Sequence, residues 1–579
     1  MFHFSKPTDA PYKRGQELPL PERFRFSGKQ SDDSLEEGKN RLVLTMFGFC
    51  LAFAAVAVQL CNVSLRGVSV ETRKSDKAQA RAVDIKRDRA DITDRNGIVL
   101  ATSLPSADLY VDTENLKNPE TIAAALAETL PDVKYQPLLK QLKSGKKFVY
   151  VKRNLIPREL YEVNRLGFPQ LNFETKEVRV YPQGSLFSHV LGVTNIDGKG
   201  VSGVEMAMNN KLTQDKETVR LSLDLGVQAA VRSVLLENIK KFSALGASAI
   251  LMNAKTGEIV SMVSLPDFDP NNRQNARENQ FFNTTTSGVY EAGSIMKTFN
   301  TAIGLDTGTV KVTDTFDARN PLILANFKIQ DEKKLQKILT LSEVMEKSSN
   351  VGSAKIALAV GGKKQKEYLT KFGFLDAPEI ELPEKGRPLY PKKKWRDVNT
   401  ATISYGYGLS VSPLQVVAAA AAVVNGGIYR NPTLISRPFG KKNYERRVIS
   451  EKTSKTMRAI MRRVVTQGTA TRANIPGFEV GGKTGSAQKN TRGGYIKGTV
   501  QTSFLGAFPM DDPQYVLMVM MDAPKGIAET YNLNNAGWNA VPTAGQIIST
   551  VAPQLGISPR PFDSKTDAPY VKAAFETQG

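Results

Sequence analysis

One long apolar run constrains this chain more than any other feature. Residues 42–61 read LVLTMFGFCLAFAAVAVQLC, and within them only Thr45 and Gln59 are distinctly polar. At a helical rise of about 1.5 Å per residue, the run spans about 30 Å, the thickness of one bilayer core. The sequence therefore predicts a single transmembrane helix over residues 42–61, in preference to a buried core helix.

The flank of this run predicts its orientation in the membrane. Basic residues precede it at Lys6, Lys13, Arg14, Arg23, Arg25, Lys29, Lys39 and Arg41. Such an excess marks the cytoplasmic side of a membrane helix. A cleaved signal peptide is not expected, because about forty residues precede the run and no A-x-A site follows it. We expect a single-pass protein of the cell inner membrane, with residues 1–41 as a disordered cytoplasmic tail and the later residues in the periplasm.

Charge and composition limit the classes of partner and cofactor to be expected. The 579 residues include 78 Lys and Arg against 57 Asp and Glu, a formal net charge of +21. Nucleic acid is not an expected partner outside the cytoplasm. We instead expect the positive charge to contact anionic lipid or an anionic polymer. Two Cys and two His leave little material for disulfide frameworks, metal sites or histidine catalysis. We therefore expect no metal and no organic cofactor.

Beyond the apolar run, the pattern changes near residue 221. Residues 62–220 mix short alternating strands, such as 148–151, with a helix near 122–130, and we assign them to a non-catalytic module. Residues 221–579 form the predicted catalytic domain. There the sequence predicts helices at 226–240 and 412–424 and hairpins of strands at 249–254 with 259–263 and at 502–508 with 515–521. The expected architecture has helices lying on an antiparallel sheet.

The chemistry begins at residues 293–299, which read GSIMKTF. If this stretch begins a helix, positions i and i+3 share a face, and the Lys297 amine lies beside the Ser294 hydroxyl. A serine needs a base to act as a nucleophile, and a desolvated lysine near another cation has a lowered pKa that suits the task. We predict Ser294 as the nucleophile and Lys297 as its base.

A second element, SSN at residues 348–350, follows in chain order. Ser348 can relay a proton to a leaving amine, and Asn350 can hold a substrate amide. Both are predicted members of the catalytic site.

The third element is KTGS at residues 483–486. Lys483 supplies a second cation, which is expected to lower the pKa of Lys297 and to attract a carboxylate. Gly485 lets the strand approach the substrate closely, since it has no side chain.

Two of these motifs have chance counterparts. An S-x-x-K pattern alone is expected on the order of one or two times by chance in such a length. SGKK at residues 144–147 is charged and glycine-rich, which is typical of an exposed turn, and KTG at 255–257 precedes the serine and is typical of a hairpin turn. Ser294 instead begins a run whose apolar residues can pack beneath it.

The three elements, in this order, resemble the S-x-x-K, S-x-N and K-T-G set shared by penicillin-binding proteins and class A β-lactamases. YEAGSIMK at residues 290–297 resembles the family's Y-E-P-G-S-x-x-K with Ala292 in place of Pro, and Ser486 stands where Thr is common. The resemblance implies an α+β fold: a penicillin-binding, serine β-lactamase-like transpeptidase domain with an antiparallel sheet and helices.

Upstream motifs narrow the resemblance to class B penicillin-binding proteins. RADITDRNG at residues 89–97 resembles that class's R-G-x-I-x-D-R-N-G, and RVYPQG at 179–184, His189 and GVE at 203–205 resemble the motifs that close its pedestal. The pedestal is a mixed α/β, dimerisation-type domain, here assigned to residues 62–220. SYGYGLSVSPLQ at residues 404–415 resembles the division-type (FtsI) branch more than the elongation-type branch.

The resemblance implies a peptidoglycan D,D-transpeptidase that cross-links stem peptides at the division septum and is a target of β-lactams. In this reaction Ser294 attacks the carbonyl of the penultimate D-Ala and Lys297 takes its proton. The backbone N–H groups of Ser294 and Ser486 would form the oxyanion hole. Thr484 and Ser486 would hold the terminal carboxylate beside Gly485, and an amine from a neighbouring stem peptide would resolve the acyl-enzyme.

The same resemblance implies partners. These are the D-Ala-D-Ala donor peptides, β-lactams, a SEDS-type glycosyltransferase (FtsW) and other divisome proteins, with the pedestal and the membrane helix as contact surfaces. Two other functions stay open: a membrane-tethered divisome scaffold with little or no catalysis, and a β-lactam-hydrolysing enzyme of the same fold. His189 is expected to pack or hydrogen-bond within the fold, and Trp395 and Trp538 either pack or line a groove.

Overall fold

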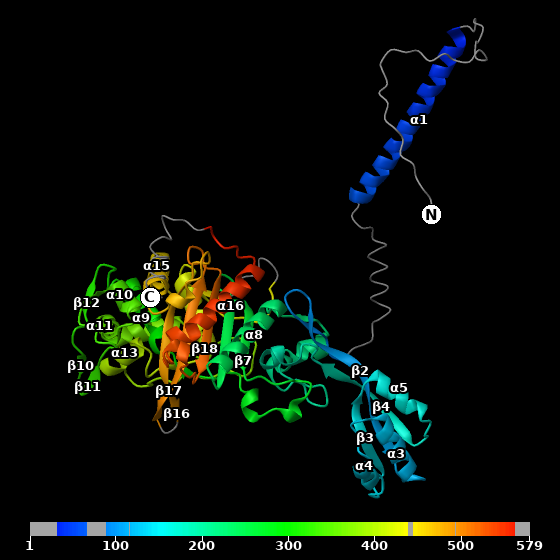
Figure 1. The fold of residues 1–579 in the computed structure, drawn as a ribbon, viewed down its shortest axis with the longest axis horizontal. Helices are drawn as coiled ribbons and strands as arrows, with labels where there is room; N and C mark the ends of the chain where they lie inside the picture. The colour runs from blue at the N-terminus through cyan, green and yellow to red at the C-terminus, as the bar shows by residue number, and fades with distance from the viewer. Residues whose placement is uncertain (1–31, 66–87, 115, 438–443, 492–493, 562–579) are drawn as a thin grey trace, which may run out of the picture. The chain divides into compact units, whose positions relative to one another are not determined.

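The computed structural model describes residues 32–65, 88–114, 116–437, 444–491 and 494–561 (Figure 1). The chain divides into two compact units, residues 1–86 and residues 87–579. In the first unit, helix α1 (Asp32–Leu65) covers the apolar run and is longer than predicted at both ends. Among the described segments, no helix combines the length and the apolar character needed to cross a bilayer. Residues 1–31 of the predicted tail lie outside the described residues.

The second unit begins with a mixed α/β module, as predicted. A five-stranded sheet has the order β3-β2-β1-β5, with β4 also paired to β2. Its strands are β1 (Ile92–Thr93), β2 (Val99–Asp112), β3 (Phe148–Leu155), β4 (Leu171–Val180) and β5 (Val219–Arg220). The helices beside it in Figure 1 are α3 (Pro119–Thr129), α4 (Tyr135–Leu142) and α5 (Pro157–Arg165). Leu109 and Val111 of β2 pack against Ile122 and Leu126 of α3 in a separate core.

Residues from three upstream motifs meet in one buried ionic cluster. Glu205, in the short helix α7 (Gly203–Ala207), accepts a hydrogen bond from Arg89 Nε at 2.5 Å and another from Arg179 Nε at 2.7 Å. All three side chains are almost completely buried. A carboxylate held between two guanidinium groups makes strong charge-assisted hydrogen bonds. The cluster therefore ties together three segments that are far apart in sequence.

The catalytic part is built on a second five-stranded antiparallel sheet of order β16-β17-β18-β6-β7. The strands are β6 (Gly246–Asn253), β7 (Ile259–Leu265), β16 (Gly481–Thr491), β17 (Gly494–Phe508) and β18 (Tyr515–Asp522). Helices α8 (Leu225–Lys241) and α16 (Ala540–Gln554) contact each other and pack beside β7 and β18 (Figure 1). Both predicted hairpins and the predicted helix at 226–240 are confirmed.

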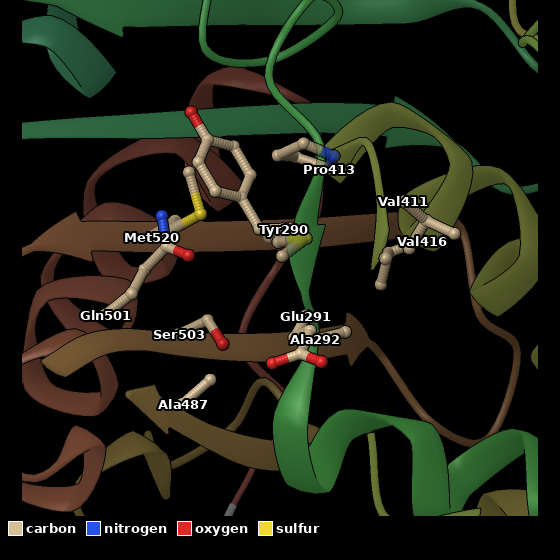
Figure 2. Close-up of a pocket in the computed structure, with 11 residues that line it drawn as sticks. Tyr290, Glu291, Ala292, Val411, Pro413, Val416, Ala487, Gln501, Ser503 and Met520 are labelled. Atoms are coloured by element: carbon tan, nitrogen blue, oxygen red, sulfur yellow. The ribbon is translucent and has the colours of Figure 1, made fainter. Parts of the chain in front are cut away.

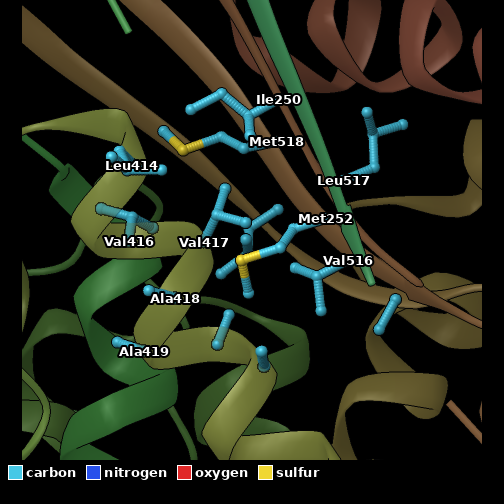
Figure 3. Packing of buried hydrophobic residues seen from close by; sticks show 14 of the residues in the cluster. Ile250, Met252, Leu414, Val416, Val417, Ala418, Ala419, Val516, Leu517 and Met518 are labelled. Carbon is cyan, nitrogen blue, oxygen red and sulfur yellow. The ribbon is translucent and has the colours of Figure 1, made fainter. Parts of the chain in front are cut away.

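Helix α14 (Pro413–Val424) is entirely buried against this sheet. Ser412 caps it, accepting from Gln415 N at 3.3 Å while its own N–H donates to Gln415 Oε1 at 3.0 Å, as the sequence predicts. Figure 3 shows its apolar side chains beside those of β6 and β18. Ile250 pairs with Met518, so alternate residues of neighbouring strands present one apolar face to the helix.

Further helices build the all-helical side of the domain. They are α9 (Met296–Asp306), α10 (Leu341–Glu346), α11 (Asn350–Val360), α12 (Gly362–Lys371), α13 (Asp397–Ser404) and α15 (Glu451–Gln467), whereas the short helix α6 (Ser188–Leu191) precedes residue 221 and belongs to the mixed α/β module. Short strand pairs connect them: β8 (Tyr290–Glu291) with β13 (Ser410–Val411), β9 (Thr315–Asp317) with β12 (Ile338–Thr340), β10 (Leu322–Leu324) with β11 (Phe327–Ile329), and β14 (Ile428–Arg430) with β15 (Glu445–Arg447). The predicted α+β architecture is confirmed, and β16 is contacted by α15 and by the 3-10 turn Gly293–Ile295 that leads into α9.

Candidate active site

Ser294 lies in the 3-10 turn Gly293–Ile295, which leads directly into α9. Gly293 has a φ of +54°, and a Cβ at this position would lie 2.8 Å from the carbonyl oxygen of Ser486 in β16. The N–H of Gly293 donates to the carbonyl oxygen of Gly406 at 3.3 Å. Glycine fits here because the turn has a left-handed residue where it touches the strand. This close approach brings Ser294 beside β16.

The segment before the turn packs against the sheet with little free space. Figure 2 shows the pocket between β8 and the sheet, lined among others by Ala292, Ala487 and Ser503. Its volume is about 10 Å³, room for one water at most. Ala292, which stands in place of the family's Pro, therefore leaves no sizeable void behind the nucleophile.

The amine of Lys297 contacts residues of both the first and the second sequence element. Its Nζ donates to Ser294 Oγ at 2.7 Å, in agreement with the predicted i, i+3 contact. It also reaches Asn350 Oδ1 at 2.7 Å, and both the carbonyl oxygen and the Oγ of Ser348, at 2.8 and 3.1 Å. The side chain is completely buried. The first two sequence elements thus converge on one nitrogen atom.

The residues of the SSN element are fixed at the start of α11. Ser348 has a φ of +59°, which is strained for a residue with a side chain. Ser349 caps the helix, since its Oγ accepts from Gly352 N at 2.9 Å. The Oγ of Ser348 lies between the two amines, 3.1 Å from Lys297 Nζ and 3.0 Å from Lys483 Nζ. It is therefore placed to pass a proton between them.

The KTGS element occupies β16, the edge strand of the sheet. Lys483 is completely buried, and Thr484 Oγ1 lies 2.8 Å from the Oγ1 of Thr469. Ser486 Oγ accepts from the N–H of Ala536 at 3.3 Å. A buried amine and two hydroxyl groups therefore lie in order along this strand.

Gly485 is required for a reason that the sequence did not reveal. A Cβ at this position would lie 2.6 Å from Ser503 Oγ and 2.8 Å from the carbonyl oxygen of Ala292. The absent side chain thus makes room for the segment that carries the nucleophile. Close approach of the substrate to the strand at Gly485 stays a prediction.

Burial sets the electrostatics of the two lysines. It lowers the pKa of Lys297 to about 7, against an opposing effect of the carboxylates of Glu332 and Asp331. Burial, together with the charge of Lys297, lowers the pKa of Lys483 well below its usual range. Desolvation is thus the main cause of both low pKa values, and the mutual repulsion of the two amines adds to it.

A cleft of about 400 Å³ opens beside the nucleophile. Of the predicted residues, Ser294, Ser348, Thr484 and Ser486 line it. Residues that the sequence analysis missed also line it, and they include Asp331, Glu332, Lys333, Thr469 and Arg472. No motif marks these residues, because they lie outside the three elements, in the segments that precede the SSN and KTGS elements.

Asp331 is the most consequential of the missed residues. Its Oδ1 accepts from the N–H groups of Asn350 at 2.6 Å and Val351 at 3.0 Å, and its Oδ2 accepts from Ser349 Oγ at 2.8 Å. The neighbouring carbonyl of Gln330 accepts from Asn350 Nδ2 at 3.1 Å. The loop after β11 therefore holds the start of α11 and turns the Asn350 oxygen toward Lys297.

Most of the other residues that the sequence singled out lie away from the cleft. Residues 144–147 lie between α4 and β3, and 255–257 lie in the turn between β6 and β7, as predicted. His189 is buried, with its Nε2 2.7 Å from the carbonyl oxygen of Gln280, and Trp395 donates to the carbonyl oxygen of Pro391 at 2.9 Å. Trp538 lines the cleft. Across the described segments, no three His, Cys, Asp or Glu side chains gather into a possible metal site.

Comparison with known proteins identifies the family. Residues 247–548 match the penicillin-binding protein transpeptidase domain, and residues 84–224 match the penicillin-binding protein dimerisation domain. The chain is 35% identical to the probable peptidoglycan D,D-transpeptidase FtsI of Caulobacter vibrioides, over 93% of this chain and 91% of that one. It is 28% identical to the peptidoglycan D,D-transpeptidase FtsI of Escherichia coli, over 88% and 91%.

A solved structure supports the fold. The crystal structure of penicillin-binding protein 3 from Mycobacterium tuberculosis, complexed with aztreonam, matches with a TM-score of 0.65 and 24% identity. The match covers 82% of this chain and 98% of that one. The matched domains, the full-length relatives and the arrangement of the three motifs agree, and the chain belongs to the class B penicillin-binding proteins of the FtsI type.

Proposed function

We propose that this chain is a serine D,D-transpeptidase that cross-links the stem peptides of peptidoglycan during cell division. One observation carries the proposal: the buried amine of Lys297 donates to Ser294 Oγ at 2.7 Å. Relatives that match over most of their length are named peptidoglycan D,D-transpeptidases and support the same reaction here.

In the first half-reaction, neutral Lys297 takes the proton of Ser294. The Oγ then attacks the carbonyl carbon of the penultimate D-Ala, and a C–O bond forms. The bond to the terminal D-Ala breaks as its nitrogen receives a proton through Ser348, which bridges the two lysines. The N–H groups of Ser294 and Ser486 would stabilise the oxyanion, and loss of one such donor typically costs about 100- to 1000-fold in rate.

The donor would be held along β16. Thr484 and Ser486 would bind its terminal carboxylate, Gly485 would keep the strand close to the nucleophile, and Asn350 would bind its amide. A bound carboxylate also favours the protonated form of Lys483, whose buried amine lacks a full counter-charge. Substrate binding would therefore place the positive charge on Lys483 and leave Lys297 neutral.

In the second half-reaction, an amine of a neighbouring stem peptide attacks the acyl-enzyme. The C–N bond forms, the ester bond to Ser294 breaks, and the serine oxygen regains a proton through Lys297. A β-lactam would acylate the same oxygen and leave a slowly hydrolysed ester.

The apolar run would anchor the enzyme. A helix over residues 42–61 would cross the inner membrane, with residues 1–41 in the cytoplasm and the pedestal (62–220) and catalytic domain (221–579) in the periplasm. The twenty-residue apolar run and its basic flank support this topology. FtsW and other divisome proteins are the expected partners of the pedestal and the membrane helix. A periplasm-dependent reporter fused at the C-terminus should be active, and an inactive fusion of a stably produced protein would contradict the topology.

The central test is labelling of the full-length protein in detergent with a fluorescent penicillin, followed by peptide mass spectrometry. We expect a stable adduct on Ser294 that disappears in Ser294→Ala. The matched control is Ser144→Ala, which alters the chance S-x-x-K and should label like the parent protein. Rapid release of opened penicillin would favour a β-lactam-hydrolysing enzyme, and a folded protein without an adduct would favour the scaffold function.

A further inference from the structure

A cross-linking enzyme must receive two substrates of opposite charge in one cleft. The donor ends in a carboxylate, and the acceptor brings an amine that is protonated near neutral pH. The inference below rests on the proposed function, because only transfer to an amine requires the second substrate.

The positive charges of the cleft favour the carboxylate of the donor over the ammonium group of the acceptor. Lys333, Lys347 and Arg472 line it, and the buried amines of Lys297 and Lys483 lie beside it. The charges of Lys333, Lys347 and Arg472 attract a carboxylate and repel an ammonium group. An acceptor therefore needs a negative group that offsets them near the acyl-serine.

Three carboxylates line the cleft, and two of them are already engaged. Asp331 accepts three hydrogen bonds from the start of α11. Glu346 is buried and pairs with Arg463 at 2.6 Å. Neither of these two can turn toward a substrate without breaking the contacts that hold the fold.

The third carboxylate, Glu332, is free to act. It is exposed, it lines the same cleft as Ser294, and within the described part of the chain it makes no hydrogen bond or ion pair. Its charge acts on both catalytic amines, since it opposes the lowering of the pKa of Lys297 and of Lys483. It also contributes, after burial and the charge of Glu291, to the raised pKa of Tyr407.

We propose that Glu332 recruits the acceptor, binding the ammonium group of the incoming stem peptide beside the acyl ester on Ser294. The ammonium then loses one proton to water. The neutral amine attacks the ester carbonyl, the C–N bond forms and the C–O bond to Ser294 breaks. The second amine proton passes through Lys297 to the Ser294 oxygen, which leaves the enzyme as it began.

The test measures how the acyl-enzyme partitions between transfer to an amine and hydrolysis. Full-length protein in detergent is acylated with a thioester analogue of the donor peptide, and the two products are quantified. One acceptor is Nα-acetyl-lysine amide, whose side-chain amine is cationic, and the other is hydroxylamine, which is uncharged near neutral pH. We expect Glu332→Gln to lower the transfer-to-hydrolysis ratio about 5-fold for the cationic acceptor and by less than about 1.5-fold for hydroxylamine.

Further variants separate charge from shape. Glu332→Asp keeps the carboxylate and should recover most of the ratio, whereas Glu332→Lys should lower it further than Glu332→Gln. High salt should remove the difference between Glu332→Gln and the parent protein, because salt screens an exposed charge. Glu237→Gln makes the same charge change at an exposed position on α8, away from the cleft lining, and should leave the ratio unchanged.

The outcomes distinguish this inference from the proposed function. An unchanged ratio in Glu332→Gln, or an equal fall with both acceptors, would overturn the role of Glu332 while the acyl-serine chemistry stands. If the parent protein forms no acyl ester on Ser294 with either the thioester or penicillin, the proposed function fails first and this inference fails with it.

Discussion

Asp331 Oδ1 accepts a hydrogen bond from the backbone N–H of Asn350 at 2.6 Å, across 19 positions of sequence. The same carboxylate holds Ser349 and Val351, which follow the strained Ser348. A left-handed serine persists when its surroundings fix it, and Asp331 supplies much of that restraint. The geometry around Lys297 thus depends on a residue outside all three motifs.

Replacing Asp331 should therefore impair acylation through geometry. Asp331→Ala leaves two N–H groups and a hydroxyl without their acceptor, a loss of about 1–3 kcal/mol in the free energy of unfolding. Ser348 and Asn350 should then move away from Lys297, and the rate constant for acylation by penicillin should fall at least about 10-fold. Stopped-flow labelling and thermal unfolding measure the two effects. Asp215→Ala, at an exposed position, is the control, and equal acylation rates for both variants would refute the positioning role.

The acylation rate should follow the protonation of Lys297. Because its pKa is lowered to about 7 and only the neutral amine accepts a proton, the rate should rise as pH increases through about 7 and then level off. Glu332 raises this pKa, so Glu332→Gln should shift the rise to lower pH, whereas Glu237→Gln should not. Stopped-flow labelling across the acid to mildly alkaline range measures the profile. A rate that stays flat through neutral pH would exclude Lys297 as the base.

Gly406 should tolerate no side chain. It has a φ of +98°, and a Cβ would lie 2.0 Å from the carbonyl oxygen of Gly293, in the turn of the nucleophile. Gly406→Ala combines backbone strain with a clash, so it should lose about 3 kcal/mol or more of stability and most acylation. Gly308→Ala is the matched control, because Gly308 also has a positive φ, +69°, but has open space around it. It should lose about 1 kcal/mol. Similar melting temperatures for the two variants would contradict the clash.

The ionic cluster of the pedestal should matter for stability and not for chemistry. Glu205→Ala leaves the guanidinium groups of Arg89 and Arg179 buried without their carboxylate, which should cost about 3–5 kcal/mol. Acylation per folded molecule should stay within about 2-fold of the parent value, since among the described residues no hydrogen bond or ion pair of the cluster reaches the three catalytic motifs. Glu217→Ala removes an exposed ion pair with Lys211 and should change stability by less than about 0.5 kcal/mol. Calorimetry together with penicillin titration checks both expectations.

Local patterns in the sequence predicted much of the fold. The cap at Ser412, the i, i+3 contact of Ser294 with Lys297, and the hairpins of the second sheet depend on residues close in sequence, so periodicity and spacing reveal them. The meeting of the three motifs was predicted by resemblance, since no local rule brings β16 to α9.

The remaining features of the site depend on contacts between segments that do not adjoin in the sequence. Asp331 reaches α11, and Thr469 reaches Thr484, from loops whose composition resembles many solvated turns. The low pKa values of the two catalytic lysines depend on burial that the residue types alone do not indicate, because both amines are completely buried. These features follow from three-dimensional contacts, which a single sequence does not specify by pattern.

The order of strands in the second sheet also determines when the enzyme can form. Strand β6 begins at Gly246, yet its partner β18 ends at Asp522, so the sheet stays open until almost the whole chain has been made. Pairings of such high sequence separation form slowly, because loop closure must precede the contacts that reward it. The serine, its base and the relay serine are all synthesised before the strand that completes their site. A truncated or stalled chain would thus carry the catalytic residues without the active site. Acylation therefore requires a chain that has reached β18.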